Sequence, residues 1–180
     1  DKALDEFNNV ITSHADNTDL VQDSQFRISN IYVELGDSAK GESVLEDLLK
    51  SDPENTQANN DLGYLWADQG KNLDKAQGMI EKALEAEPEN PAYLDSLGWV
   101  LFKQGKFEEA AEKLTTATET KNGDDSTIFD HLGDALQGLG KASEAKANYE
   151  KALELEKKKK VPSDKLLKAI QEKLDAEKAE

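Results

Sequence analysis

The amino-acid sequence predicts an all-α fold, built as a solenoid of antiparallel helix pairs. A Leu-Gly pair recurs every 35 residues, at Leu62-Gly63, Leu97-Gly98 and Leu132-Gly133, and Ile28-Ser29 stands 34 residues before the first pair. A second series of glycines keeps the same step, at Gly36, Gly70, Gly105 and Gly140. Repetition at this period is typical of arrays in which each unit is one supersecondary structure. Glycine just past a helix satisfies the last carbonyls in the left-handed conformation, so each unit is predicted to be a helical hairpin.

The whole chain, residues 1–180, is predicted to form a single domain. Its expected parts are the second helix of a truncated repeat, four repeats and a capping helix, over residues 1–15, 18–55, 56–90, 91–125, 126–157 and 162–179.

The first segment has the pattern of a second helix that lacks its first. Ala3, Phe7 and Val10 lie on one helical face, so we expect the array to continue upstream of residue 1. The next helix, from Asp19 to Leu35, begins early in the repeat register. It is therefore expected to be one turn longer than its equivalents.

The last segment is predicted to cover the end of the array. Pro162-Ser163-Asp164 has the composition of a helix start, and Leu167, Ile170 and Leu174 form one apolar stripe after it. The outer face of a terminal repeat needs such a cover to stay soluble.

The repeated residues resemble the tetratricopeptide repeat. The clearest copies are Asn60-Asp61-Leu62-Gly63-Tyr64-Leu65-Trp66 through Pro88, and Pro91-Ala92-Tyr93-Leu94-Asp95-Ser96-Leu97-Gly98-Trp99 through Ala117. The resemblance covers residues 1–157, and these two copies are most similar to repeat arrays of bacterial proteins. It implies a right-handed superhelix in which the first helix of each pair lines a concave surface that binds ligands.

The repeats depart from the family pattern at a few positions. The first has Ser29 where the family prefers glycine and Gly41 where it prefers alanine, so its helices are expected to pack slightly differently. The second has one extra residue in its turn, within residues 71–74. The fourth has Lys157 in place of the closing proline, as expected where the array ends.

The composition excludes several classes of partner. A formal charge of −16 with a single arginine, Arg27, repels phosphate backbones, so nucleic acid is not expected to bind. No apolar run approaches the length that spans a bilayer, so no membrane insertion is expected. The absence of cysteine excludes disulfides and thiolate sites but leaves the compartment undecided between cytoplasm and periplasm or cell envelope.

The candidate site is the concave groove implied by the resemblance. Its partner-binding residues are predicted to be Asn30, Asn60, Tyr64, Asp68, Asp95, Trp99, Phe102, Asp130 and Asp134. The three aromatic residues stand where the repeat needs no large core side chain, so they are expected to be exposed anchors for a peptide with apolar and basic side chains. The alternative is that they pack against the neighbouring repeat and bind nothing. Trp66, by contrast, falls on an interior position.

No catalytic, cofactor or metal site is predicted. His131 stands between Asp130 and Asp134, a spacing that could hold a metal, but an ordinary groove or surface position is favoured. The segment 138–143 has some of the glycines of a phosphate-binding loop, but Ala135 and Ala142 replace its first glycine and its hydroxyl residue, so it is interpreted as an inter-helix turn.

These observations favour a protein–protein interaction scaffold without catalytic activity. Its partner is expected to be a basic and apolar protein or peptide, and homo-oligomerisation stays open. The alternatives are a structural spacer or self-association module of a larger protein, and a regulatory module attached to an upstream enzyme domain.

Overall fold

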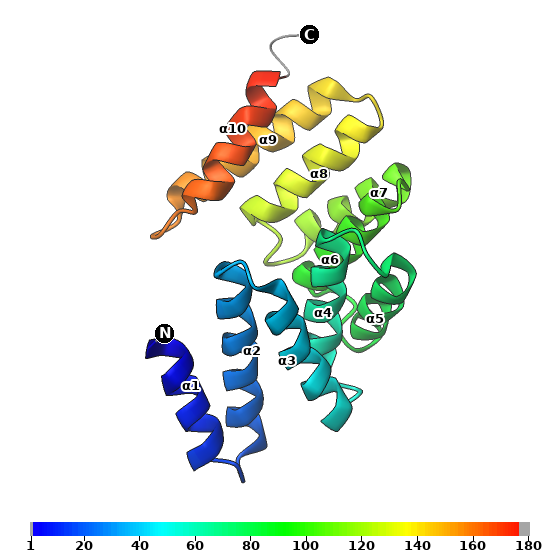
Figure 1. Cartoon of the computed structure of the whole chain (residues 1–180). Helices are drawn as coiled ribbons and strands as arrows, with labels where there is room; N and C mark the ends of the chain where they lie inside the picture. The colour runs from blue at the N-terminus through cyan, green and yellow to red at the C-terminus, as the bar shows by residue number, and fades with distance from the viewer. Residues whose placement is uncertain (1, 177–180) are drawn as a thin grey trace.

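The structure, a computed structural model, describes residues 2–176, and these residues form ten α-helices and no strand (Figure 1). Residue 1 and residues 177–179, which the predicted segments include, lie outside the described residues. The helices are α1 (Lys2–Ser13), α2 (Thr18–Glu34), α3 (Ser38–Ser51), α4 (Thr56–Asp68), α5 (Leu73–Ala86), α6 (Pro91–Lys103), α7 (Phe107–Glu119), α8 (Ser126–Gly138), α9 (Ala142–Lys158) and α10 (Asp164–Ala176).

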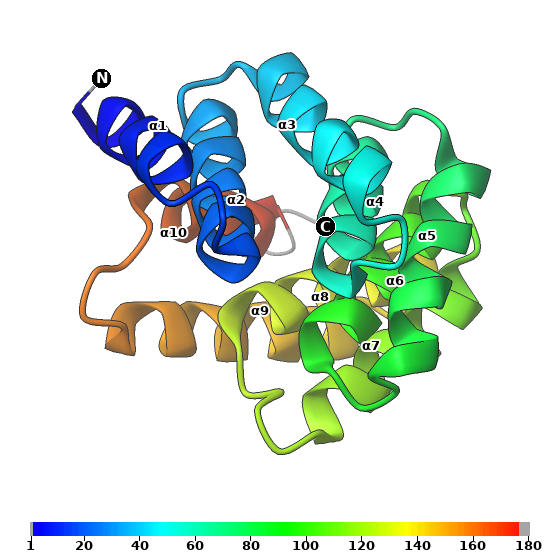
Figure 2. The same cartoon turned by 90° about the horizontal axis from the view of Figure 1, so that it is seen from below.

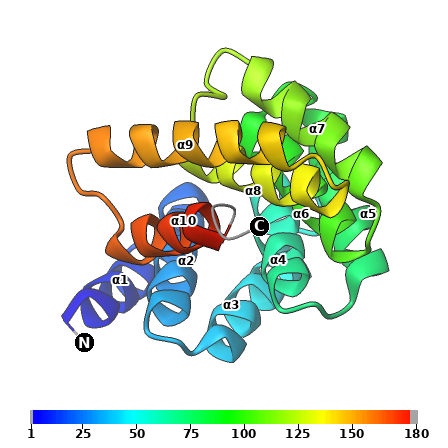
Figure 3. The same ribbon diagram turned by 90° about the horizontal axis from the view of Figure 1, so that it is seen from above.

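The helices pack as successive pairs, which confirms the predicted all-α solenoid. α2 packs on α3, α4 on α5, α6 on α7 and α8 on α9, while α4 also contacts α6, and α6 contacts α8. α1 packs against α2 at one end, and α10 packs against α9 at the other. The result is a curved stack with α2, α4, α6 and α8 on its inner side and α3, α5, α7 and α9 on its outer side (Figures 2 and 3).

The four glycines predicted to make turns have the left-handed conformation, with φ between 68° and 81°. At Gly105, for example, the N–H donates to the carbonyl of Phe102, and the next N–H, of Lys106, reaches back to Leu101. These bonds satisfy carbonyls that the end of α6 would otherwise leave open. The extra residue of the second repeat is accommodated by Asn72, which has φ 52°.

The Leu-Gly pairs mark where the two helices of a repeat approach most closely. A Cβ added at Gly98 would lie 2.4 Å from Leu114 Cγ, and one added at Gly133 would lie 2.3 Å from a ring carbon of Tyr149. In the first repeat the glycine lies on the second helix, α3, and the facing residue of α2 is a serine. Ser29 Oγ on α2 donates to the carbonyl of Gly41 on α3 at 3.0 Å, and a Cβ on Gly41 would meet Ser29 O at 3.1 Å. The expected difference in packing is therefore an exchange of which helix carries the glycine.

Glu42 joins the first repeat to the second. Its carboxylate, on α3, accepts from Trp66 Nε1 at 3.1 Å, from Gln69 at 2.8 Å and from Lys71 Nζ at 2.7 Å. Burial opposes its charge, but these donors outweigh burial and lower the pKa of Glu42. Trp66 is 3% exposed, which confirms its predicted interior position.

Glu156 plays the corresponding part at the other end. Its carboxylate, on α9, accepts from Ser126 Oγ at 2.5 Å, from the backbone N–H of Ser163 at 2.6 Å and from Lys159 Nζ at 2.8 Å. Burial opposes its charge, but the three donors outweigh it and lower the pKa of Glu156. One carboxylate thus connects the start of α8, the end of α9 and the turn before α10.

Three helices near the ends of the array, α1, α2 and α10, differ from those of the central repeats. α2 has 17 residues whereas α4, α6 and α8 have 13 each, which agrees with the predicted extra turn. α10 buries Ile170 and Leu174 against the last repeat. α1 contains no buried residue, so its attachment to α2 is shallower.

Candidate concave binding site

The nine predicted residues lie on the inner helices α2, α4, α6 and α8, but they differ widely in exposure. They range from exposed (Asn30, Asp68) through half-buried (Tyr64, Phe102, Asp134) to buried (Asn60, Asp95, Trp99, Asp130). The groove is therefore not the uniformly open aromatic and acidic surface that the repeat register predicts.

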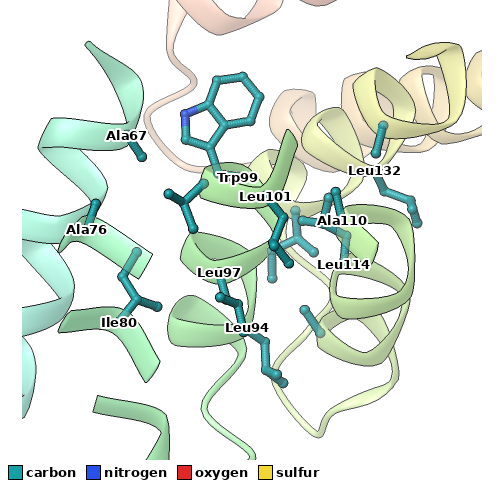
Figure 4. Packing of buried hydrophobic residues seen from close by; sticks show 14 of the residues in the cluster. Ala67, Ala76, Ile80, Leu94, Leu97, Trp99, Leu101, Ala110, Leu114 and Leu132 are labelled. Atoms are coloured by element: carbon teal, nitrogen blue, oxygen red, sulfur yellow. The ribbon is translucent and has the colours of Figure 1, made fainter. Parts of the chain in front are cut away.

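Trp99 is the clearest correction. The repeat register predicts an exposed anchor, but only 9% of Trp99 is exposed. Its ring stacks on that of His131, with centroids 4.1 Å apart, and on that of Phe102, with centroids 5.1 Å apart. Figure 4 shows the ring leaving α6 away from Leu94 and Leu97, which lie in the core. The neighbouring helix α8 covers the ring, in agreement with the alternative interpretation for this residue.

His131, on α8, is buried rather than on the surface. Its Nδ1 lies 2.9 Å from Asp95 Oδ1, so α8 and α6 are joined by a buried polar contact. Burial lowers the pKa of His131, but the carboxylates of Asp95, Asp130 and Asp134 raise it by more, so the net direction is upward. The charged imidazolium is thus stabilised by three surrounding carboxylates.

The end of the groove next to α10 is occupied by the chain itself. Lys173 Nζ, on α10, lies 2.9 Å from Asp130 Oδ1 and 2.7 Å from Asp134 Oδ1. Tyr149 donates its hydroxyl to Asp134 at 2.9 Å. Burial raises the pKa of Asp130, and Lys173 only partly offsets this effect. Two of the carboxylates predicted to meet a partner therefore already have a cationic neighbour.

Tyr64 connects this buried cluster to the open half of the groove. Its ring centroid lies 6.4 Å from that of His131. Burial raises the pKa of its hydroxyl, and the nearby charges of Asp95, Asp68 and Asp130 raise it further. Burial and these charges thus favour the neutral form of the hydroxyl.

A hollow of about 420 Å³ lies beside Tyr64, between α2, α4 and α6. This volume falls within the ordinary range for ligand pockets. Its lining mixes polar and apolar side chains: Ser29, Asn30, Val33, Leu45, Gln57, Asn60, Asp61, Tyr64, Leu65, Ala92, Asp95 and Ser96. A larger hollow of about 690 Å³ is formed by residues 87–91, the last of which begins α6, and by Asn122.

The sequence reasoning missed three contributors to this face: His131 as a buried partner of Asp95, Lys173, and Asp61. Lys173 could have been suspected, because it directly precedes Leu174 of the apolar stripe, and a partly buried lysine there is stabilised by a counter-charge. The sequence did not indicate Asp61, because Asp61 lies next to the repeated groove position at Asn60 and does not occupy it.

The arrangement of metal-ligating side chains and the apolarity of the helices are two further features of the described part of the chain. Among residues 2–176, no three or more His, Cys, Asp or Glu side chains gather where they could hold a metal ion. Within the same residues, none of the helices combines the length and apolarity needed to cross a membrane.

Two family profiles match the chain. The one described as "Tetratricopeptide repeat" matches residues 32–100, and the one described as "Anaphase-promoting complex, cyclosome, subunit 3" matches residues 69–152. No curated protein matches the chain.

Several solved structures share the fold. A thermophilic TPR protein of Thermus thermophilus is 19% identical, with 95% of this chain and 88% of that one covered and a TM-score of 0.75. The Sgt2 TPR domain of Aspergillus fumigatus is 27% identical, with 69% and 77% covered and a TM-score of 0.59. A chain of the APC/C hetero-tetramer Cut9–Hcn1 is 17% identical, with 99% and 33% covered and a TM-score of 0.82.

Proposed function

From the premise that the chain belongs to the tetratricopeptide-repeat family, whose general role is protein–protein interaction, we propose that it binds a basic and apolar peptide segment of a partner protein along its inner face. The single observation that carries the proposal is the hollow between α2, α4 and α6, where polar atoms converge beside apolar side chains. Sites of this composition fix the orientation of a ligand with a few polar groups while apolar contacts supply area.

The charge of the groove supports a basic partner. The chain carries a formal charge of −16, and Asp68 and Asp95 flank Tyr64 on the inner helices. Such a field accelerates the encounter with a basic segment and disfavours an acidic one. The Cut9–Hcn1 structure, by its title, is a hetero-tetramer, which illustrates assembly with a partner in a protein of similar fold.

The open part of the groove is the half nearer the N-terminus. Lys173 is bound at Asp130 and Asp134, so a basic segment gains little there. Asn30 and Asp68 are exposed. Asn30 lines the hollow, and Asp68 lies on α4, other residues of which line it. The predicted binding residues Asn30, Asn60, Tyr64 and Asp68 therefore stay in the proposal as direct contacts, whereas Trp99 supports the face from beneath.

The test is selection from a random peptide library displayed on phage, followed by binding measurements on the selected peptides. The groove variant is Asn30→Lys/Asp68→Lys, which changes exposed residues only. The control is Asn122→Lys/Asp16→Lys, which makes the same charge change in exposed turns. We expect the groove variant to lose binding and the control to retain it. Binding of the selected peptides to the wild type and to the control should weaken at high salt. Equal binding to both variants, or no selected peptide, would favour a spacer or self-association module.

A further inference from the structure

The carboxylates of the inner face follow a pattern along the array. Asp130 and Asp134, on α8, bind Lys173 of α10 at 2.9 and 2.7 Å. Asp95, on α6, pairs with His131 of α8 at 2.9 Å. In both cases the basic group comes from the second helix further along the chain, α10 in the first case and α8 in the second.

The pattern breaks at α4, beside the hollow. Asn60 occupies the place on α4 that Asp95 takes on α6, 35 residues later. Its Nδ2 donates to Asp61 Oδ1 at 3.1 Å, but its Oδ1 is buried and accepts no hydrogen bond. Asp61 forms no ion pair within residues 2–176, and burial raises its pKa. An acceptor and a carboxylate therefore lie side by side without a cation.

An unpaired buried oxygen is a costly feature. Only 6% of Asn60 is exposed, and a buried polar atom without a partner costs about 1–3 kcal/mol. The cost would be removed if a donor that enters the hollow reached this oxygen, which neighbouring side chains now cover, so they would have to move aside. Asn60 Nδ2 already donates to Asp61, so a flip of the amide would break that hydrogen bond and leave Nδ2 unpaired in place of Oδ1.

The shape of the hollow selects a long side chain with a cationic head. None of its twelve lining residues is Lys, Arg or His, so it offers no positive charge of its own. Val33, Leu65 and Ala92 provide apolar surface for an aliphatic stem, and Asn60 and Asp61 line the same hollow. A guanidinium carries five N–H donors in a planar fork and is more weakly hydrated than an ammonium, so it can reach both acceptors at a smaller desolvation cost.

We propose that the hollow between α2, α4 and α6 binds an arginine side chain of the partner, with the guanidinium donating to Asn60 Oδ1 and the Asp61 carboxylate. The proposal rests on the proposed function, because the arginine arrives on a peptide that lies along the groove. It adds the identity of one anchor and its position.

The test uses N-acetyl-arginine methylamide as probe, followed by amide chemical shifts of the full chain. The comparison probe is the citrulline analogue, which keeps the shape and loses the charge. We expect the arginine probe to shift amides of α2, α4 and α6 around the hollow, and the citrulline probe to bind at least about tenfold more weakly, since a hydrogen bond to a charged group contributes about 1.5–3 kcal/mol. Equal binding of both probes, or shifts away from the hollow, would overturn the assignment.

The matched variants are Asp61→Asn in the hollow and Asp16→Asn in the exposed turn between α1 and α2. Both remove one carboxylate. The amide introduced by Asp61→Asn keeps an oxygen that can accept from Asn60, so the fold should persist, as circular dichroism would verify. We expect Asp61→Asn to weaken the arginine probe about tenfold and Asp16→Asn to leave it unchanged. An unchanged affinity in the Asp61→Asn variant would refute the role of the Asp61 carboxylate.

The arginine proposal and the proposed function fail separately. If library peptides bind the inner face but tolerate arginine-to-citrulline replacement and the Asp61→Asn change, the arginine anchor is wrong and the proposed function stands. If no library peptide binds the inner face, the proposed function is wrong, and the free arginine probe alone decides whether the hollow recognises a guanidinium.

Discussion

Gly98 offers the most direct test of how the helices of a repeat are held together. A Cβ at this position would lie 2.4 Å from Leu114 Cγ and 2.9 and 3.1 Å from its two methyl carbons. Carbon atoms in contact are separated by about 3.5–4.0 Å, so Gly98→Ala requires a shift of about 1 Å. Leu114 is fully buried, and α6 is held between α4 and α8, so neither can move freely.

The expected magnitude follows from two opposing effects. Overpacking of a well-packed core costs about 1–3 kcal/mol. Alanine in a helix interior is favoured over glycine by about 0.5–1 kcal/mol. Since the clash involves a branch carbon of Leu114 rather than a flexible chain end, we expect the upper part of the first range. The net loss in the free energy of unfolding is then about 1–2 kcal/mol.

The chain contains its own control for this substitution. Gly78 lies within α5, and a Cβ added there meets no atom within 4 Å. Gly78→Ala should therefore raise the free energy of unfolding by about 0.5–1 kcal/mol. Urea unfolding followed by far-ultraviolet circular dichroism would compare the variants, with hydrogen exchange in α6 and α7 locating the effect. A Gly98→Ala variant as stable as wild type, beside a stabilised Gly78→Ala variant, would refute the close-approach explanation.

Three further predictions concern the end of the array and the inner face. Deleting residues 162–180 should raise hydrogen exchange in α8 and α9 before other helices, and uniform protection after the deletion would contradict this. Glu156→Gln should lower the free energy of unfolding by about 1–2 kcal/mol at neutral pH. Because the folded-state pKa of Glu156 is lowered, its contribution is present above the unfolded value and lost as pH falls through the folded one, so variant and wild type should converge in acid. Asp95→Asn should lower the pKa of His131, which NMR titration would measure. Protonated His131 contributes stability at low pH, and this contribution is lost as pH rises through its raised pKa, so the variant should gain less stability at low pH than the wild type.

The repeat architecture could be predicted because it depends on residues that recur at a fixed spacing and act locally. Glycine turns such as Gly105 and close approaches such as Gly98 each depend on one residue type at one spacing. The exchange between Ser29 and Gly41 was visible only as two separate departures, because it is a relation between facing helices.

The inner face was predicted less completely, because its exposure is decided by contacts between repeats. Trp99 occupies a groove position in the repeat register, yet His131 from the next repeat covers it. The contact between His131 and Asp95 spans 36 residues, and that between Lys173 and Asp130 spans 43. A period of 35 residues identifies equivalent positions, but it does not tell which neighbour fills the space between them.

The same contacts divide the groove into a closed half and an open half. Where Lys173 meets Asp130, an incoming basic group would have to displace a cation that α10 holds in place, and it would gain only the difference between two similar interactions. At Asn60 and Asp61 no described residue supplies that cation, so an incoming one would not have to displace another. The affinity of a basic partner should therefore depend on the α2–α4–α6 half, although both halves are acidic.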